Sequence, residues 1–182
     1  MTKPTDPGRR GFLLAAGAAT LATIASPAFA SVGRTHFRSV ALDNLHTGEK
    51  LKVDYWVDGR YVKGALHRVN YNLRDFRTGT VHPIDPQLLD LLDALRRMLG
   101  TRAPFQVISG YRSPETNAML REESNGVAAN SLHVQGMAID IRLPGRSLRS
   151  LHAAAVRLER GGVGYYPRSD FVHVDVGRVR YW

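Results

Sequence analysis

The 182-residue sequence contains no cysteine, which excludes disulfide bonds and cysteine-ligated metal sites. A chain of this length favours a single domain and can bury an adequate core without covalent cross-links. Beyond the first thirty residues, no apolar run is long enough to cross a bilayer. Acidic residues are scarce as well, since 16 Asp and Glu stand against 25 Lys and Arg.

This imbalance gives a formal charge of +9, which predicts attraction to polyanions. The first thirty residues hold three basic residues and one acidic residue, so the remainder keeps +7. The basic residues are scattered and no nucleic-acid-binding motif accompanies them, so we expect no nucleic acid partner. Cell-wall polymers and lipid headgroups fit the charge, and a merely soluble basic surface is the alternative.

Residues 1–30 have the features of a twin-arginine-type export signal rather than of a folded segment. Arg9 and Arg10 precede a weakly apolar stretch of about 15 residues, which is too short to span a bilayer comfortably. Ala28-Phe29-Ala30 then supplies a small-residue cleavage pattern. We expect cleavage near Ala30, a periplasmic location and no stable membrane anchor afterwards.

Hydrophobic periodicity predicts one α+β domain over residues 31–182. Strands are expected at 38–42, 51–57, 60–62, 105–108, 137–143, 163–166 and 171–176. Helices are expected from Ala65 to Phe76, from Asp85 to Leu99, from Ser113 to Glu123 and from Ser147 to Leu158. Because strands and helices do not alternate regularly, we expect an antiparallel sheet with helices packed against it and a cleft on the sheet.

Two of these strands combine an aliphatic face with a polar one. In residues 137–143, aliphatic side chains occupy every other position and Asp140 lies on the opposite face. In residues 171–176, valines alternate with His173. If these strands are near each other in the sheet, both polar side chains point into the same space, and His133 comes from the loop just before the first strand.

Two imidazoles and one carboxylate are a ligand set typical of catalytic zinc. His133, Asp140 and His173 therefore predict one Zn²⁺ per chain. Three protein ligands leave a coordination position for water, which zinc activates near neutral pH. The spacing alone is weak evidence, because histidine and aspartate are common on surfaces, and the shared alternation of the two strands strengthens it.

The motif Ser131-x-His133-x-x-Gly136-x-Ala138-x-Asp140, followed by His-Val-Asp at 173–175, resembles the zinc-dependent peptidases that cut peptidoglycan peptides. This family includes D-Ala-D-Ala dipeptidases and carboxypeptidases, phage L-alanyl-D-glutamate peptidases and the murein endopeptidase K group, to which the sequence is most similar. The resemblance covers nearly the whole chain, including the segments LHTGE (45–49), ISGYRS (108–113), GGVGYYPRS (161–169) and RYW (180–182). It implies that His133, Asp140 and the histidine at 173 bind zinc.

The resemblance also bears on the remaining site residues. A general base is expected three positions before the last histidine ligand, where Asp170 stands, and Asp175 is the competing candidate because it shares the His173 face. A turn residue is the alternative role for Asp170. Arg112 lies between a strand end and a helix start, where it is expected to bind a substrate carboxylate or the developing oxyanion. A structural ion pair is its alternative.

Ser131 and Tyr165 are expected to contact substrate, although Ser131 is equally suited to capping its loop. By the resemblance, the chain is expected to be a zinc-dependent murein endopeptidase, and we expect it to be a monomer. Its partners would be peptidoglycan stem peptides, cut at D-Ala–diaminopimelate or diaminopimelate–diaminopimelate cross-links. The alternatives are a D,D- or L,D-carboxypeptidase or an L-alanyl-D-glutamate peptidase on the same scaffold, and a non-catalytic peptidoglycan-binding protein.

Overall fold

The structure is a computed structural model that describes residues 36–123 and 128–182. The expected export signal, residues 1–30, lies outside the described residues. In the described part of the chain, no helix is both long enough and apolar enough to cross a membrane. The expected α+β class is confirmed, because these residues form eight strands and four helices around one sheet.

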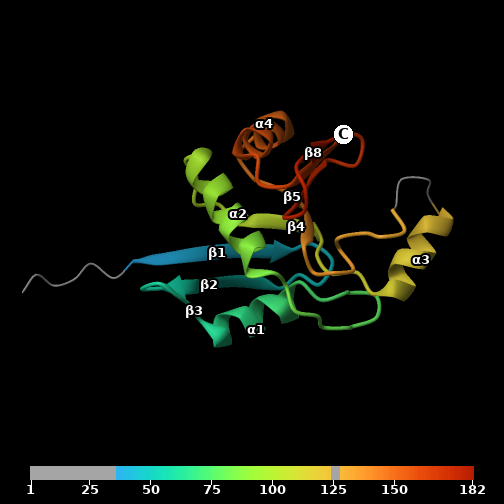
Figure 1. Ribbon diagram of the computed structural model, residues 1–182, viewed down its shortest axis with the longest axis horizontal. Helices are drawn as coiled ribbons and strands as arrows, with labels where there is room; N and C mark the ends of the chain where they lie inside the picture. The colour runs from blue at the N-terminus through green and yellow to red at the C-terminus, as the bar shows by residue number, and fades with distance from the viewer. Residues whose placement is uncertain (1–35, 124–127) are drawn as a thin grey trace, which may run out of the picture. The chain divides into compact units, whose positions relative to one another are not determined.

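All eight strands belong to one sheet with the order β3-β2-β1-β4-β5-β7-β6-β8 (Figure 1). Most neighbours are antiparallel, as expected, but β1 pairs with β4 and β6 pairs with β8 in parallel. Parallel pairs require crossover connections, which periodicity in a sequence does not reveal. The strands are β1 (Phe37–Asn44), β2 (Lys50–Val57), β3 (Arg60–Tyr61), β4 (Phe105–Ser109), β5 (Ala138–Arg142), β6 (Gly162–Tyr166), β7 (Phe171–Asp175) and β8 (Arg180–Tyr181).

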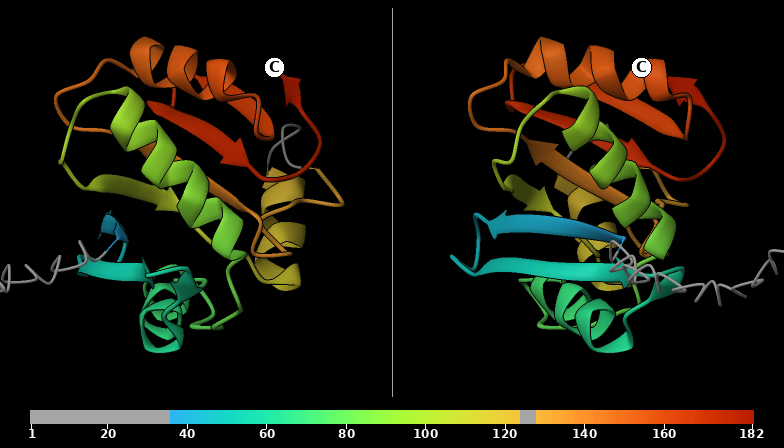
Figure 2. Two further views of the ribbon diagram at one scale, coloured as in Figure 1. Left: turned by 60° about the vertical axis from the view of Figure 1, so that its left-hand side comes forward. Right: turned by 90° about the vertical axis from the view of Figure 1, so that its left-hand side faces the viewer.

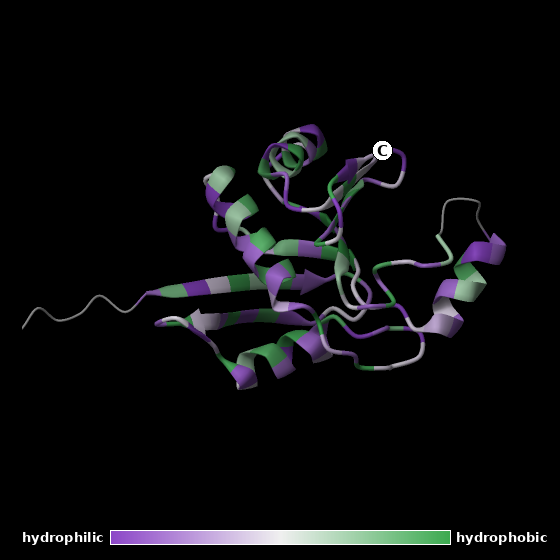
Figure 3. Cartoon of the chain, in the orientation of Figure 1, coloured by the Kyte–Doolittle hydropathy of each residue, from purple (hydrophilic) through white to green (hydrophobic). Residues whose placement is uncertain are grey.

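Two helices, α2 (Pro86–Met98) and α4 (Leu148–Leu158), pack against each other and against the sheet (Figure 2). Helix α1 (Lys63–Asn72) packs along β2, and α3 (Pro114–Glu123) follows the segment that leaves β4. Apolar and polar residues alternate along α2 and β1 in Figure 3. The apolar stripe of α2 supplies much of the core, with Leu88, Leu89, Leu91, Leu92 and Leu95 all buried.

Side-chain caps mark the starts of α2 and α4, at the residues where the sequence predicts these helices to begin. Oδ1 of Asp85 accepts a hydrogen bond from the backbone nitrogen of Gln87 at 2.8 Å, and Pro86 occupies the first turn. Oγ of Ser147 accepts one from the backbone nitrogen of Ser150 at 3.1 Å. These caps fix where α2 and α4 begin, and thereby how their apolar faces meet the sheet.

Helix α1 is shorter than predicted, because it ends at Asn72 rather than at Phe76. The backbone nitrogen of Asp75 donates to the carbonyl of Thr80 at 3.0 Å, which turns the chain out of the helix. The ring of Phe76 stacks on His46 instead, with 3.8 Å between ring centroids. Phe76 therefore lies in the turn after α1, although its spacing from the preceding apolar residues fits a helix.

Candidate metal centre

Asp140 and His173 lie directly opposite each other on the neighbouring antiparallel strands β5 and β7. Their side chains share one face of the sheet, while flanking aliphatic residues pack into the core from the other face. Those flanking residues are Ile139, Ile141, Val172 and Val174, each with no exposed surface. The expected adjacency of the two strands is confirmed, and their register holds the carboxylate beside the imidazole.

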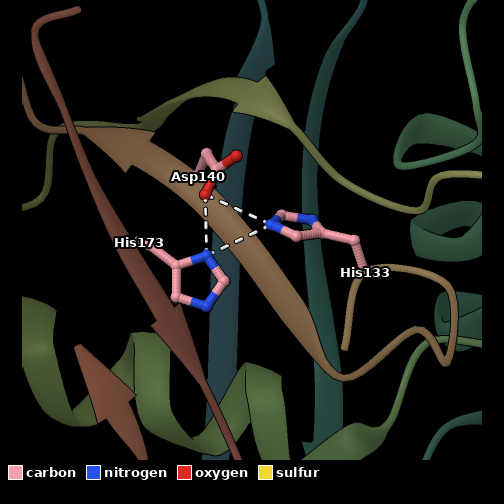
Figure 4. A group of neighbouring side chains, drawn as sticks. All are labelled: His133, Asp140 and His173. Atoms are coloured by element: carbon pink, nitrogen blue, oxygen red, sulfur yellow. Dashed lines mark hydrogen bonds and ion pairs between the residues drawn. The ribbon is translucent and has the colours of Figure 1, made fainter. Parts of the chain in front are cut away.

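His133 reaches the same place from the turn before β5 (Figure 4). The backbone nitrogen of Gly136 donates to the carbonyl of His133 at 3.2 Å, and that of Met137 donates to Leu132 at 3.0 Å. Gly136 has a φ of 68°, and a side chain there would overlap the carbonyl oxygen of Pro83. The turn that aims His133 at β5 therefore requires glycine at this position.

Three atoms of these side chains converge in a small triangle (Figure 4). Nε2 of His133 lies 3.2 Å from Oδ1 of Asp140 and 3.2 Å from Nδ1 of His173, and the latter two atoms are 2.9 Å apart. In a tetrahedral zinc site with bonds of about 2.0–2.1 Å, ligand atoms lie about 3.3 Å apart. The triangle thus matches one face of a zinc tetrahedron.

The hydrogen-bond partners of the two imidazoles also fit a metal ion. Nδ1 of His133 lies 2.7 Å from the carbonyl oxygen of Gly110, which can only accept, so this nitrogen carries the proton. Nε2 of His173 lies 3.0 Å from Oδ2 of Asp175. A carboxylate oxygen can only accept, so Nε2 carries the proton of this ring. When both rings are neutral, as metal ligation requires, each turns a lone pair toward Asp140. Three converging acceptors repel one another unless a cation lies between them.

Burial and neighbouring charges shift the pKa values of the three residues. Burial lowers the pKa of His133 and so favours the neutral ring that a metal ligand requires. Burial favours the neutral acid for Asp140, but His133 and His173 hold its pKa well below the usual range. Burial opposes a charge on His173, yet hydrogen bonds with Asp140 and Asp175 leave its pKa raised. Asp140 is therefore ionised at neutral pH and supplies the anionic donor.

Asp175 lies behind His173 and is completely buried. Its Oδ1 accepts hydrogen bonds from the backbone nitrogens of Gly162 and Gly177, both at 2.9 Å, and Arg180 donates to Oδ2 at 2.7 Å. Burial alone would raise the pKa of this carboxyl, but these partners and His173 hold it well below the usual range. Its oxygens are engaged on the far side of His173 from the cluster, which suits orientation of that ring.

Arg112 reaches the cluster from the opposite side. Its Nε donates to Oγ of Ser109 at 2.8 Å, and its Nη2 lies 3.2 Å from Nε2 of His133. The same Nη2 forms a close ion pair with Oδ2 of Asp140, so Oδ1 is the oxygen left facing the two histidines. A guanidinium here adds positive charge at the edge of the site, where a substrate oxygen would approach.

The backbone around Arg112 is tied to the end of α1. The backbone nitrogen of Tyr111 donates to the carbonyl of Leu73 at 2.8 Å, and that of Ser113 donates to Oδ2 of the buried Asp75 at 2.8 Å. These two bonds bracket Arg112. The position of its guanidinium is therefore set by the fold rather than by the side chain alone.

The other predicted substrate residues differ in their placement. Ser131 lines the cleft above the cluster, and its Oγ also accepts a hydrogen bond from the backbone nitrogen of His133 at 3.3 Å. Tyr165 is not brought to the cluster, because its ring lies against His152 of α4, with 4.9 Å between centroids. It is Tyr166, one residue further along β6, that lines the cleft.

The structure does not bring Asp170 to the cluster either. This residue has a φ of 53° and a side chain that is 61% exposed, and its Oδ2 forms an ion pair with Arg142 at 2.6 Å. It lines a different surface depression from the one above the cluster. Among the described residues that line the cleft, Asp140 is the only carboxylate.

Three aromatic side chains also line the cleft: Tyr166, Phe171 and Trp182. Sequence reasoning assigned no role in the site to Phe171 or Trp182. The alternation that places His173 on the polar face of β7 also places Phe171 there, so a local signal existed for that residue. Trp182 had no such signal, because the parallel pairing of β8 with β6 brings it to the site.

Comparison with known proteins identifies the family. Residues 33–182 match the family model Peptidase_M15_2, described as peptidoglycan L,D-endopeptidase MepK. The chain is 46% identical over 179 residues to the peptidoglycan L,D-endopeptidase MepK of Escherichia coli K12, covering 97% of this chain and 98% of that protein. It is 40% identical to the probable peptidoglycan L,D-endopeptidase MepK of Haemophilus influenzae Rd, covering 97% and 96% of the two chains. The chain therefore belongs to the MepK family of M15 peptidases.

Proposed function

We propose that this protein is a zinc-dependent endopeptidase that hydrolyses peptide cross-links of peptidoglycan. The convergence of three buried donor atoms at the floor of a cleft carries this proposal. The family supports it, because relatives of nearly the same length carry the name peptidoglycan L,D-endopeptidase. A non-catalytic peptidoglycan-binding protein would have no need of such a donor set.

The residues of the chain would divide the work as follows. His133, Asp140 and His173 hold one zinc ion, which when bound supplies a Lewis acid for the peptide carbonyl and lowers the pKa of water. Asp175 holds the ring of His173 so that Nδ1 faces the cleft. Arg112 binds a substrate carboxylate or the developing oxyanion beside Asp140. Ser131 supports the turn of His133 and faces the substrate.

The name of the relatives narrows the choice between the two expected cross-links. A diaminopimelate–diaminopimelate link joins an L centre to a D centre, whereas a D-Ala–diaminopimelate link joins two D centres. The relatives are named L,D-endopeptidases. We therefore favour the diaminopimelate–diaminopimelate bond as the substrate of this chain.

We further propose that the protein acts in the periplasm as a monomer, after export by a twin-arginine signal and cleavage near Ala30. The family match begins at residue 33, just past the expected cleavage position. Changing Arg9 and Arg10 to lysine should leave the protein in the cytoplasmic fraction, whereas unchanged export would contradict the twin-arginine route.

The central test uses the mature protein and purified sacculi of known cross-link type. With zinc, cross-linked dimers should disappear and monomeric muropeptides should accumulate, and a chelator should prevent this. Product masses separate the alternatives: loss of a single terminal residue indicates a carboxypeptidase, and release of whole stems indicates an L-alanyl-D-glutamate peptidase. Binding to sacculi without any change in muropeptides, unaffected by His133→Ala, would overturn the proposal in favour of a binding protein.

A further inference from the structure

The cleft has chemically different walls on the two sides of the cluster. Beside His173 lie three aromatic side chains, of which Tyr166 and Phe171 stack with 4.5 Å between ring centroids. The ring of Trp182 lies 5.3 Å from that of His173. Beside His133, by contrast, lies the guanidinium of Arg112. A ligand in this cleft therefore meets an aromatic surface with Arg180 beside it on one side, and the guanidinium of Arg112 on the other.

Trp182 is held in place by its backbone. Its nitrogen donates to the carbonyl of Val163 at 3.2 Å, and its carbonyl accepts from the nitrogen of Tyr165 at 2.9 Å. These bonds extend the pairing of β8 with β6 by one residue. A substitution of the Trp182 side chain leaves both bonds intact, so the side chain can be tested apart from the strand.

The indole of Trp182 is also fixed from several directions. Its Nε1 donates to the hydroxyl of Tyr166 at 2.7 Å, and the guanidinium of Arg180 lies 5.0 Å from its ring centroid. Beneath it lies Gly164, where a Cβ would come within 2.7 Å of Cε2 of the indole. The residue is nevertheless 49% exposed. A tryptophan used only for packing would be buried, whereas this residue is oriented by its contacts and keeps about half of its surface exposed.

We propose that Trp182 is a specificity-determining residue that contacts the aliphatic side chain of the diaminopimelate residue next to the bond being cut. This inference rests on the proposed endopeptidase function. The distance to His173 places the indole within about two residues of the scissile bond, since extended peptide spans about 3.3–3.6 Å per residue. Methylene groups pack well on an aromatic face.

A sugar ring is the competing occupant of this wall. In a stem peptide, L-alanine and D-glutamate separate the diaminopimelate from the glycan, and these two residues span about 7 Å when the chain is extended. A glycan would therefore lie beyond the part of the cleft that Trp182 covers. The geometry therefore favours the diaminopimelate side chain, rather than a sugar ring, as the group that contacts Trp182.

The test compares the metal-loaded wild type with Trp182→Ala, Trp182→Phe and Tyr181→Ala on glycan-free cross-linked peptides. Tyr181 is a matched control, because it is the preceding residue of the same strand and is similarly exposed, but does not line the cleft. Loss of one aromatic contact should raise KM about tenfold in Trp182→Ala while kcat changes less than about threefold. Trp182→Phe and Tyr181→Ala should stay within about threefold of wild type in KM.

The zinc content of each variant must equal that of the wild type, because damage to His173 would change it. An unchanged KM in Trp182→Ala would overturn the inference, and so would a rise in KM that appears only on substrates carrying the disaccharide. The latter result would mean that Trp182 contacts the sugar rather than the peptide.

A binding measurement separates this inference from the proposed function. In a Trp56→Phe background, Trp182 is the sole tryptophan and its fluorescence reports directly on the wall. Titration of the metal-loaded protein with a non-hydrolysable cross-linked peptide should shift this emission. If wild type cleaves nothing yet the emission shifts, the endopeptidase proposal fails and the contact stands. If wild type cleaves normally and the emission stays constant, the proposed Trp182 contact is wrong while the endopeptidase proposal stands.

Discussion

Oδ2 of Asp175 lies 3.0 Å from Nε2 of His173, the ring nitrogen that points away from the cluster. Asp175 has no exposed surface, and its other contacts are two backbone nitrogens and Arg180. The carboxylate therefore fixes which nitrogen of His173 carries the proton and which faces the cleft.

We expect Asp175→Asn to weaken zinc binding by about 10- to 100-fold, because an amide neither fixes the tautomer nor strengthens the donor as a carboxylate does. Competition with a chromophoric chelator would measure this. Arg180→Gln is the matched variant, since it removes one partner of Asp175 but keeps the carboxylate, and should lose less affinity. Wild-type zinc affinity in a folded Asp175→Asn protein would show that the contact is only structural.

Asp170 gives a sharp test of the base expected three positions before His173. Because its side chain is 61% exposed and paired with Arg142, we expect Asp170→Asn to keep kcat/KM within about threefold of wild type. Asparagine also tolerates the φ of 53° found here, so the turn should persist. Steady-state kinetics on cross-linked peptides would decide. A loss of about 100-fold or more would mean that the turn reorients and that Asp170 handles a proton.

The parts of the site that depend on local periodicity could be predicted from the sequence. A period of two residues places Asp140 and His173 on the polar faces of their strands whichever strands neighbour them. Only a short turn separates His133 from β5, so its approach to Asp140 also depends on nearby residues alone. The helix caps at Asp85 and Ser147 follow from local side-chain chemistry in the same way.

The parts that depend on turn conformation or on distant pairing could not be predicted. A turn at Asp170 was one of the expected roles of this residue, but the sequence does not show that its left-handed backbone directs the side chain toward Arg142. Asp175 shares the polar face with His173, but only the close approach of Gly162 and Arg180 shows that its oxygens are engaged. The position of Trp182 follows from the parallel pairing of β8 with β6, which is non-local.

Arg112 should act on turnover more than on metal binding. We expect Arg112→Gln to lower kcat by about 100-fold, since it removes a charged donor from the edge of the site. Zinc content should be retained, because the three ligand residues are unchanged. Arg112→Lys should recover only part of the activity, because an ammonium cannot bridge Ser109 and Asp140 as the guanidinium does. Normal kcat in Arg112→Gln would restrict this residue to an ion-pair role.

Asp90 on α2 links the helix to three strands and gives a test of stability. It accepts hydrogen bonds from Arg38 at 2.6 Å, from Tyr55 at 2.9 Å and from Tyr61 at 2.7 Å. Burial alone would raise the pKa of Asp90, but these partners lower it. A carboxyl whose pKa falls on folding stabilises the protein above its ordinary pKa of about 3.9, and this stabilisation is lost as the pH falls through the folded value.

We therefore expect Asp90→Asn to lower the free energy of unfolding by about 1–3 kcal/mol at neutral pH. The difference from wild type should begin to shrink below about pH 4, where Asp90 of the unfolded chain starts to bind a proton, and should vanish below the lowered pKa of the folded state. Urea unfolding at both pH values would measure it. Asp54→Asn removes the same charge from an exposed position on β2 and should change stability by less than about 0.5 kcal/mol. An Asp90→Asn deficit that stays constant down to low pH would contradict the charge-based explanation.

Metal binding should be visible in stability as well as in activity. Because zinc would bind the assembled triangle of His133, Asp140 and His173 and not the unfolded chain, zinc at about 100 times its Kd should add about 2.7 kcal/mol. For a domain of this size, that corresponds to a rise in Tm of about 5–10 °C, which a chelator should reverse. His133→Ala should abolish the zinc-dependent rise, whereas His152→Ala, on α4, should retain it. A His133→Ala protein whose Tm still rises with zinc as in the wild type would place the ion elsewhere.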